Sequence, residues 1–422
     1  MDKFLQKIFS IKNSNNKHHK IITIFGHSYA VRKSLFVPIW HKLRYYNYIE
    51  TQKNNSKEYF VPISDSAYNN SNEVKPIAFY LPQFHSIPLN DENFGKGFTE
   101  WTNVTKAIPQ FEGHHQPQLP IDVGFYDLST DNIMYRQVEL AKMYGIYGFC
   151  FYYYWFSGKR LLEKPLFNWL NNKELNLPFC LCWADENWSK QWDGGNCEIM
   201  MEQKLQDGDD EKFFYDILPF FKDERYIKID NKPFLIIYRL NLFATDRINH
   251  FLKTIRELAK KEGFNGIHIV AAESFYFNNQ DNIYDIDCSV EFPPHNISSL
   301  TKYKPKYINS EFIGKIIDMS EYIKTKPYIK DKNKYKTVFA GWDNTARKAR
   351  SNATVFLCNP KLYKEWLSDL IKWTKDNHKE KDQFVFINAW NEWGEGAHLE
   401  PDQRYGYAYL QATKDALEET GD

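Results

Sequence analysis

The sequence predicts an α/β protein whose main domain is a (β/α)8 barrel of the TIM type, preceded by a small N-terminal appendage. Two observations predict the barrel. Eight short, nearly continuous apolar runs follow one another from residue 76 onward, as expected for parallel strands that are buried on both faces. Helical patterns lie between most of these runs, which is the alternation that a barrel requires. At 422 residues, the chain is long enough for one such domain with insertions.

The first 74 residues differ in composition from the rest of the chain. Residues 12–20 are polar and basic, Lys20–Lys33 predicts a short β-hairpin around Gly26, and residues 51–74 are rich in Asn, Ser, Lys and Tyr. We interpret residues 1–74 as a basic appendage with a linker, and residues 75–422 as the barrel domain. Two interpretations of residues 1–50 remain open. In the first, they contact a membrane surface or a partner peripherally, and in the second, which we favour, they form a solvated tail.

The barrel domain is expected to alternate strands with helices. The expected strands are Pro76–Leu81, Ile146–Trp155, Phe179–Trp183, Phe234–Leu240, His268–Ala272, Cys288–Phe292, Val338–Trp342 and Phe384–Trp390. Apolar residues at helical spacing predict helices over Thr130–Tyr144, Asp246–Gly263 and Leu362–Asp376. The connection from Ala272 to Cys288 is short for a full helix. The long, basic segment His295–Tyr335 is interpreted as a helical insertion.

Charge and cysteine usage narrow the class of protein. Lys+Arg and Asp+Glu both count 54, and this balance argues against a general nucleic-acid binder. The six cysteines show no CxxC pair or metal-ligand spacing, which favours free thiols in a reducing compartment. The chain has neither a signal-like apolar core near its start nor a stretch of the roughly 20 apolar residues that span a bilayer. We therefore expect a cytoplasmic protein, membrane-associated at most through its appendage, without a metal or organic cofactor.

The strongest chemical signal follows the last expected strand, in the run Asn388-Ala-Trp-Asn-Glu-Trp-Gly-Glu395. Two carboxylates three residues apart, Glu392 and Glu395, lie among tryptophans and amides. Cleavage or transfer of an acetal needs one carboxyl group to protonate the leaving oxygen and another to act as base or nucleophile. The alternative is a helix N-terminus, where acidic residues suit the helix dipole. We predict that Glu392 and Glu395 are catalytic.

Polar and aromatic side chains recur at the ends of the other expected strands, where a barrel carries its active site. Trp183-Ala-Asp-Glu-Asn-Trp188 repeats the pattern of acid and amide between tryptophans. Tryptophan faces pack against sugar rings and amides bind hydroxyls, although capping or salt-bridge roles are alternatives for single residues. The predicted substrate-binding residues are Tyr80, Gln83, His85, Glu100, Trp101, Tyr153, Tyr154, Trp155, Trp183, Asp185, Glu186, Asn187, Trp188, Tyr238, Glu273, Glu291, Trp342, Asn388, Trp390 and Asn391.

Taken in order, these motifs resemble the WbsX-like family, which is described as glycoside hydrolase family 99-like. The resemblance runs from about Lys75 to the C-terminus and is carried by Tyr80–Phe84, Phe98–Trp101, Tyr152–Trp155, Trp183–Trp188 and Asn388–Glu395. It implies a (β/α)8 barrel and a setting in bacterial surface-polysaccharide synthesis, such as O-antigen or capsule. The hydrolase relatives are endo-α-mannosidases with a Glu-x-x-Glu pair. The match implies that Glu392 assists attack by the sugar's own 2-hydroxyl group and that Glu395 protonates the leaving group.

Three hypotheses about function remain open. The first, which we favour, is an enzyme that cleaves or transfers an α-mannoside-like glycosidic bond, acting on an oligosaccharide or a lipid-linked glycan. The second is a nucleotide-sugar-dependent glycosyltransferase of lipopolysaccharide biosynthesis, although no Gly-rich nucleotide-binding fingerprint follows a strand. The third is a non-catalytic glycan-binding protein.

Overall fold

The computed structural model describes residues 9–13, 19–25, 27–32, 46, 52, 55–69, 72–190, 198–275, 277, 283–295, 297, 301–330, 334–348 and 352–421. The chain divides into two compact units, one of residues 1–54 with 112–115 and one of residues 55–111 with 116–422. The domain boundary expected between residues 74 and 75 stays a prediction.

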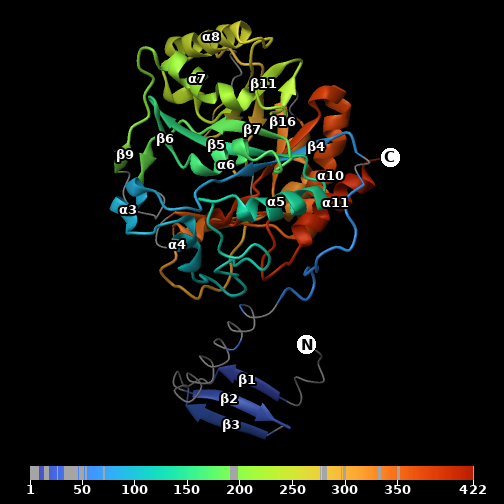
Figure 1. Cartoon of the computed structure of the whole chain (residues 1–422). Helices are drawn as coiled ribbons and strands as arrows, with labels where there is room; N and C mark the ends of the chain where they lie inside the picture. Colours follow the sequence, from blue (N-terminus) through green and yellow to red (C-terminus); the bar gives the residue numbers. More distant parts are fainter. Residues whose placement is uncertain are drawn as a thin grey trace. The chain divides into compact units, whose positions relative to one another are not determined.

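The smaller unit contains a three-stranded antiparallel sheet (Figure 1), formed by β1 (Phe9–Asn13), β2 (His19–Ile24) and β3 (His27–Arg32). Strands β2 and β3 pair with Ile24 opposite His27, which confirms the hairpin predicted over Lys20–Lys33. Gly26, at its turn, lies outside the described residues.

The larger unit is built on a closed barrel of eight parallel strands, which confirms the predicted fold (Figure 1). In spatial order the strands are β4 (Lys75–Tyr80), β5 (Gly148–Phe156), β7 (Phe179–Trp183), β11 (Lys232–Ile237), β12 (His268–Glu273), β13 (Cys288–Glu291), β16 (Lys334–Phe339) and β19 (Phe384–Asn388). Pairing of β19 with β4 closes the barrel, with Phe384 opposite Lys75. Each strand overlaps one of the eight predicted runs. Strand β16 begins four residues before the predicted start at Val338, because Lys334 and Lys336 interrupt the apolar pattern on which the prediction rested.

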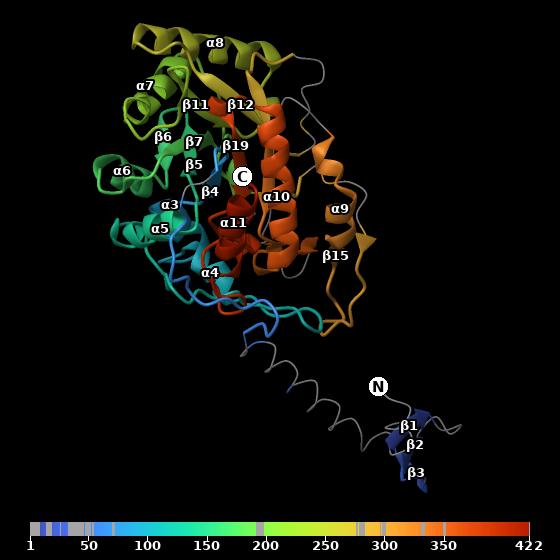
Figure 2. The same cartoon turned by 90° about the vertical axis from the view of Figure 1, so that its right-hand side faces the viewer.

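Helices cover the outside of the barrel. Three of them, α5 (Asn132–Met143), α8 (Thr245–Lys261) and α10 (Pro360–Asn377), confirm the predicted helices. Figure 2 shows α10 beside α11, and the two helices pack together. The other helices are α3 (Pro88–Phe94), α4 (Glu100–Thr105), α6 (Lys164–Asn171), α7 (Asp209–Phe221), α9 (Ser320–Thr325) and α11 (Ala408–Glu419). None of the helices in the described part of the chain is long and apolar enough to cross a membrane.

The predicted helical insertion at His295–Tyr335 is wrong for most of its described residues. These residues form β14 (Thr301–Lys302), β15 (Gly314–Asp318), the single short helix α9 and the 3₁₀ turn η4 (Pro327–Ile329). Strand β15 pairs in parallel with β18 (Ala353–Leu357), so its hydrogen bonds go to a segment far along the chain that no local pattern reveals. In the gap before β13, the described part of residues 274–287 contains no helix, consistent with its short length.

Short elements complete the loops at the carboxyl ends of the barrel strands. The strands are β6 (Lys159–Leu161), β8 (Trp188–Ser189), β9 (Ile199–Met201), β17 (Trp342–Asp343), β20 (Asn391–Glu392) and β21 (Ala397–His398), while β10 (Lys228–Ile229) pairs beside β11. The 3₁₀ turns at these ends are η3 (Leu240–Leu242), η5 (Asn344–Ala346) and η7 (Trp393–Glu395), while η6 (Glu380–Asp382) precedes β19.

Candidate active site

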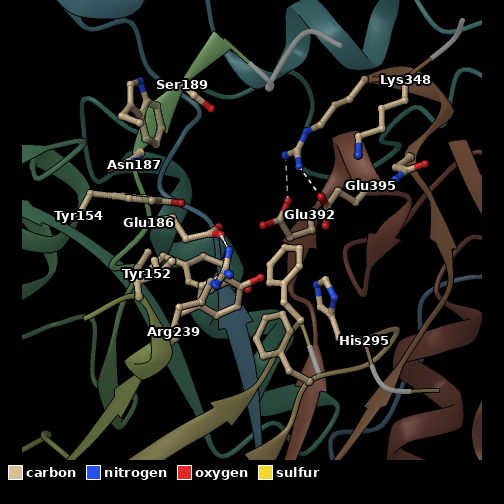
Figure 3. Close-up of a pocket in the computed structure, with 18 of the residues that line it drawn as sticks. Tyr152, Tyr154, Glu186, Asn187, Ser189, Arg239, His295, Lys348, Glu392 and Glu395 are labelled. Atoms are coloured by element: carbon tan, nitrogen blue, oxygen red, sulfur yellow. Dashed lines mark hydrogen bonds and ion pairs between the residues drawn. The ribbon is translucent and has the colours of Figure 1, made fainter. Parts of the chain in front are cut away.

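A pocket of about 500 Å³ lies at the carboxyl ends of the barrel strands (Figure 3). Its walls come from segments that are far apart in the sequence and are brought together only by closure of the barrel. Predicted residues that line the pocket are Tyr154, Glu186, Asn187, Trp188, Tyr238, Trp342, Glu392 and Glu395. Figure 3 shows Asn187 and Ser189 across the pocket from Lys348 and Glu395.

Glu392 and Glu395 converge on a single guanidinium group, that of Arg347. Its Nη2 donates to Glu392 Oε2 at 3.1 Å and its Nη1 donates to Glu395 Oε1 at 2.7 Å. Dashed lines in Figure 3 mark these two ion pairs. The Nε of Arg347 donates to Glu100 Oε1 at 2.8 Å, so the three donor positions of one side chain hold three carboxylates. Glu100 therefore reaches the pair through Arg347 and does not line the pocket itself.

The short turn after β19 fixes the direction of both glutamates. Strands β20 and β21 pair as a hairpin with Glu392 opposite Ala397, and η7 brings Glu395 back to the same side. Gly394 lies between them because a Cβ atom there would stand 1.8 Å from Glu100 Oε1 and 2.9 Å from Arg347 Nε. The glycine thus leaves the space that the Glu100–Arg347 ion pair occupies.

Arg347 is placed by the turn η5, which follows β17. The Asp343 carboxylate caps this turn by accepting the backbone N–H of Thr345 at 3.0 Å, and it also accepts from Gln116 at 2.6 Å. The next residue, Lys348, lines the pocket as well. The capped turn thus places the cationic side chains of Arg347 and Lys348 on the same side of the pocket as the two glutamates.

The buried carboxylate of Glu400 anchors the tryptophans on both sides of Glu392. Trp390 Nε1 donates to Glu400 Oε1 at 3.1 Å and Trp393 Nε1 donates to Oε2 at 2.7 Å. Tyr126 and Gln137 donate two more hydrogen bonds, at 2.9 and 2.7 Å. Burial raises the pKa of Glu400 to about 7, although these donors oppose the shift. The prediction that Trp390 binds substrate is corrected by these contacts, since its ring is fully buried and serves the scaffold.

Two predicted amides also support the scaffold and do not line the pocket. Asn391 accepts the backbone N–H of Leu81 at 2.7 Å and donates to the carbonyl of the same residue at 3.0 Å, so it ties strand β20 to the end of β4. Asn388 donates to the Pro293 carbonyl at 2.8 Å. Both amides are buried, and Asn391 also donates to the Tyr126 hydroxyl at 3.1 Å.

The electrostatics of the glutamate pair favour a shared proton. Burial raises the pKa of Glu392 to about 8 and raises the pKa of Glu395 as well, while Arg347 lowers both. Three carboxylates surround one guanidinium, so full ionisation would leave surplus negative charge in a site of low dielectric. The cluster therefore favours a proton that is kept within the glutamate pair near neutral pH, as acid–base chemistry needs.

A second ion pair lines the pocket, between Glu186 and Arg239 at 2.6 Å. The Arg239 guanidinium lies over the ring of Phe275, 4.4 Å from its centre. Asp185 does not line the pocket, because its Oδ1 accepts the backbone N–H of Arg239 at 2.7 Å. Burial raises the pKa of Asp185 to about 7.

The aromatic run on β5 divides between the two faces of the strand, as a period of two requires. Tyr152 and Tyr154 line the pocket. The predictions for Tyr153 and Trp155 are corrected, since the Tyr153 hydroxyl donates to Asp216 and Trp155 packs against Phe213.

Several other predicted residues are buried away from the pocket. Trp183 packs against Phe213 and Phe251 of the surrounding helices. Tyr80 donates to Gln137 at 2.7 Å, and Trp101 donates to the carbonyl of Tyr126 at 2.9 Å.

The remaining four predictions also fall outside this pocket. Gln83 and His85 are buried, and His85 Nδ1 donates to the Pro82 carbonyl at 3.0 Å. Glu273 and Glu291 pair with Lys334 at 2.9 Å and Lys336 at 2.6 Å and line a different pocket. Lys334 and Lys336 lie far along the chain from Glu273 and Glu291, so the local sequence did not reveal these ion pairs.

The predicted substrate-binding residues omit part of the pocket wall, comprising Tyr152, Ala184, Ser189, Ile199, Arg239, Leu242, Phe275, Phe292, His295, Asn344, Arg347 and Lys348. Strand alternation could have found Tyr152 once Tyr154 was chosen. Arg347 follows the run Trp342-Asp-Asn-Thr-Ala after a barrel strand, but its loop position carried no signal of its three acidic partners. Burial, with Arg239 and Lys348 close by, lowers the pKa of His295 to about 4, so its imidazole is neutral at physiological pH.

Fold and site together define a (β/α)8-barrel protein with a paired-carboxylate pocket at the strand ends. The family model described as Glycosyltransferase WbsX matches residues 76–413. The chain belongs to this WbsX glycosyltransferase family, as predicted. The family and the structural relatives are carbohydrate-active enzymes.

Two sequence relatives come from two strains of Xanthomonas campestris pv. campestris, and each is described as an uncharacterized protein, WxcX. Each is 40% identical over 346 residues, which is 81% of this chain and 49% of the relative. The chain thus spans about half the length of the curated relatives that it matches.

Two solved structures share the fold at 12% sequence identity. A glycoside hydrolase-like protein has a TM-score of 0.53, with 86% of this chain and 98% of the other covered. The GH99 endo-alpha-mannosidase from Bacteroides thetaiotaomicron has a TM-score of 0.50, with 82% and 97% covered. At this identity the likeness shows the fold alone.

Proposed function

We propose that this chain cleaves or transfers a glycosidic bond of a bacterial surface polysaccharide, such as O-antigen or capsule, with Glu392 and Glu395 as the reacting carboxyl groups. The observation that carries the proposal is the convergence of both glutamates on Arg347 at the wall of the pocket. A non-catalytic binding protein has no need to bury two carboxylates against one guanidinium, because that arrangement is costly unless it is used.

The proposed first step follows the Glu-x-x-Glu match. Glu392 accepts the proton of the sugar's 2-hydroxyl group as that oxygen attacks the anomeric carbon. The bond to the leaving oxygen breaks, and Glu395 gives its proton to that oxygen. In the second step, water or an acceptor hydroxyl attacks the anomeric carbon and gives its proton to Glu395. The bond from that carbon to the 2-oxygen breaks, and Glu392 returns its proton to the 2-oxygen, giving hydrolysis or transfer. The raised pKa values support a proton that is held within the coupled pair near neutral pH, and the proposed step draws that proton from Glu395.

The pocket walls support a saccharide as substrate. Tyr154 and Trp188 pack edge to face with ring centres 5.1 Å apart, and both line the pocket. Asn187 and the Glu186–Arg239 pair supply hydrogen-bonding groups beside these rings. Aromatic faces with a few oriented polar groups suit a sugar, whose ring has apolar faces and polar edges. The proposed substrate is an α-mannoside-like oligosaccharide or lipid-linked glycan.

A nucleotide-sugar-dependent glycosyltransferase is the second candidate. The family's description favours it, and so do two cationic side chains in the pocket wall, Arg239 and Lys348, which suit a diphosphate.

One experiment separates the candidates. Purified protein is incubated with the surface glycan of the producing cell, with and without nucleotide-sugars, and products are read by mass spectrometry. Shortened or rearranged chains without a nucleotide-sugar would support the first candidate. Extension that requires a nucleotide-sugar would support the second, and binding without any product would support a glycan-binding role.

A further inference from the structure

The candidate pocket has an apolar edge that the proposed reaction does not use. Three large apolar side chains line the pocket and stay exposed: Ile199 by 51%, Leu242 by 44% and Phe275 by 41%. They lie in the loops that follow β7, β11 and β12, which are neighbouring strands of the barrel. Strand β19, which leads into the two glutamates, lies on the opposite side of the barrel from β11. The apolar edge therefore lies across the pocket from the reacting groups.

The chemistry of this edge suits a hydrocarbon chain. Exposed apolar side chains that gather at the mouth of a pocket mark a surface that a ligand covers. Ile199 and Leu242 donate and accept no hydrogen bonds, and they lack the flat ring on which a sugar packs. Phe275 has a backbone φ of +45°, a left-handed conformation that costs energy for a residue with a side chain and that clusters at binding sites.

Two cationic side chains lie beside the apolar edge, and both line the pocket (Figure 3). The Arg239 guanidinium lies 4.4 Å from the ring centre of Phe275, and the His295 ring lies 4.2 Å from the same centre. Burial, Arg239 and Lys348 all lower the pKa of His295, so both cations are near that ring.

Both cations keep donors for a ligand. Arg239 uses Nη1 for Glu186, and its Nη2 has no hydrogen bond to a residue that the structure describes. The ammonium group of Lys348 has neither a hydrogen bond nor an ion pair within the described part of the chain. Charge-assisted donors of this kind bind phosphate oxygens. An anion that carries a hydrocarbon chain would therefore satisfy the cations and cover the apolar edge together.

We propose that this pocket takes a glycan that is joined through a phosphate or diphosphate group to a long apolar chain. The anionic group contacts Arg239 and Lys348, and the chain covers the apolar edge. The inference rests on the proposed function for the glycan, and it narrows the substrate class to the lipid-linked form. A nucleotide fits this edge less well, because Ile199 and Leu242 offer no partner for the polar atoms of a base.

Direct binding of small probes tests the proposal without any requirement for activity. Farnesyl diphosphate carries the chain and the anion, farnesol carries the chain alone, and inorganic diphosphate carries the anion alone. Isothermal titration calorimetry, below the concentration at which farnesyl diphosphate forms micelles, should give this probe a Kd at least about tenfold lower than that of either fragment. An equal Kd for inorganic diphosphate, tighter binding of uridine diphosphate, or no binding of farnesyl diphosphate would overturn the proposal.

Variants of the edge give the second readout. Leu242→Asn and Ile199→Asn should each raise the Kd of farnesyl diphosphate about 3- to 10-fold, because each removes apolar surface that the chain covers, and should leave inorganic diphosphate unaffected. Lys348→Gln should weaken both probes. Ile108→Asn is the matched control, because Ile108 is 58% exposed and does not line the pocket. Equal Kd values for farnesyl diphosphate in the Leu242→Asn and Ile108→Asn variants would contradict a chain on this edge.

The two proposals fail separately. If Glu392→Gln forms product at the full rate while farnesyl diphosphate binds as expected, the catalytic pair is wrong and the lipid site stands. If free oligosaccharide is cleaved, and Glu392→Gln abolishes the cleavage, but farnesyl diphosphate does not bind, the proposed function stands and the lipid site is wrong.

Discussion

At the scale of single residues, Arg347 is the side chain on which the candidate site depends most. Its guanidinium group contacts Glu100, Glu392 and Glu395 and is almost fully buried. Removal of the guanidinium group leaves three carboxylates close together in a dry site, and each must then be neutralised or repelled. Arg347 therefore determines both the positions of the three carboxylates and their tendency to bind protons.

Arg347→Met should lower kcat/KM about 100-fold or more, because it removes a preorganised charge at the reacting groups. Arg347→Lys keeps the charge but loses the forked geometry, so an intermediate loss is expected. Thermal unfolding serves as the control, since loss of a buried pair costs about 3–5 kcal/mol of stability in typical cases. Near-normal activity of a folded Met variant would contradict the role assigned to Arg347.

The raised pKa values predict how activity depends on pH. Below its pKa the acid of the pair is protonated, and as pH rises it loses the proton that the leaving group needs. Burial raises the pKa of Glu395, the acid of the proposed step, above its ordinary value, so activity should fall as pH rises through that raised pKa. Burial raises the pKa of its partner Glu392 to about 8, so Glu392 contributes stability that is present below its ordinary pKa and lost as pH rises through about 8. Rates measured from pH 4 to 10 check this, and a rate that keeps rising through the alkaline range would count against it.

The sequence predicted the two glutamates because a Glu-x-x-Glu pair at a strand end carries its own chemical signal. It did not predict Arg347, whose three partners come from α4, β20 and η7. Trp390 and Asn391 looked like sugar contacts, yet they bind Glu400 and the backbone of Leu81. Aromatic and amide residues suit a buried scaffold as well as a ligand, and only the fold distinguishes the two uses.

At the scale of elements, the turn η7 joins the two glutamates through Gly394. The position has no room for a side chain, because Glu100 Oε1 occupies the place of a Cβ atom. The glycine in the Glu-Trp-Gly-Glu run is thus explained by an ion pair that reaches the turn from a distant helix.

Gly394→Ala should lower kcat at least about tenfold, because the new methyl group displaces Glu100 and with it the Arg347 guanidinium. A double-mutant cycle with Glu100→Ala tests the cause. The added Glu100→Ala should recover part of the stability lost in Gly394→Ala, since it removes the atom that the methyl group meets. Strictly additive losses in the cycle would show that the clash is not the reason.

The barrel strands could be predicted because each is an apolar run whose length and position repeat. Strand β15 could not be predicted, since its partner β18 lies across the connection that carries β16 and β17. Within β5, alternation was the available guide, and it assigns Tyr152 with Tyr154 to the pocket and Tyr153 with Trp155 to the helices. Local sequence patterns thus predicted most of the barrel strands. The pairing of distant segments determined which side chains face the pocket and which face the helices.

At the scale of the whole molecule, the family match covers the barrel and leaves the N-terminal residues outside it. The contact of residues 1–50 with a membrane surface and a cytoplasmic location stay predictions. If these residues are a solvated basic tail, their attraction to an anionic surface should be screened at about 0.15 M salt.

Cosedimentation with anionic vesicles checks this expectation. The full chain should remain in the supernatant at about 0.15 M salt and bind, at most, at low salt. A chain that begins at residue 55 is the comparison. Binding of the full chain at the higher salt, lost with the shorter chain, would favour membrane docking over a tail.

The most direct test of the central claim compares Glu392→Gln and Glu395→Gln with the wild-type chain on the surface glycan of the producing cell, without nucleotide-sugar. Glu419→Gln is the control, because Glu419 is an exposed residue at the end of α11 that pairs with Lys364 of α10 and does not line the pocket. Product formation followed by mass spectrometry should fall at least about 1,000-fold in both site variants, as loss of a reacting acid or base implies, and stay unchanged in the control. Full product formation by either folded site variant would contradict the account.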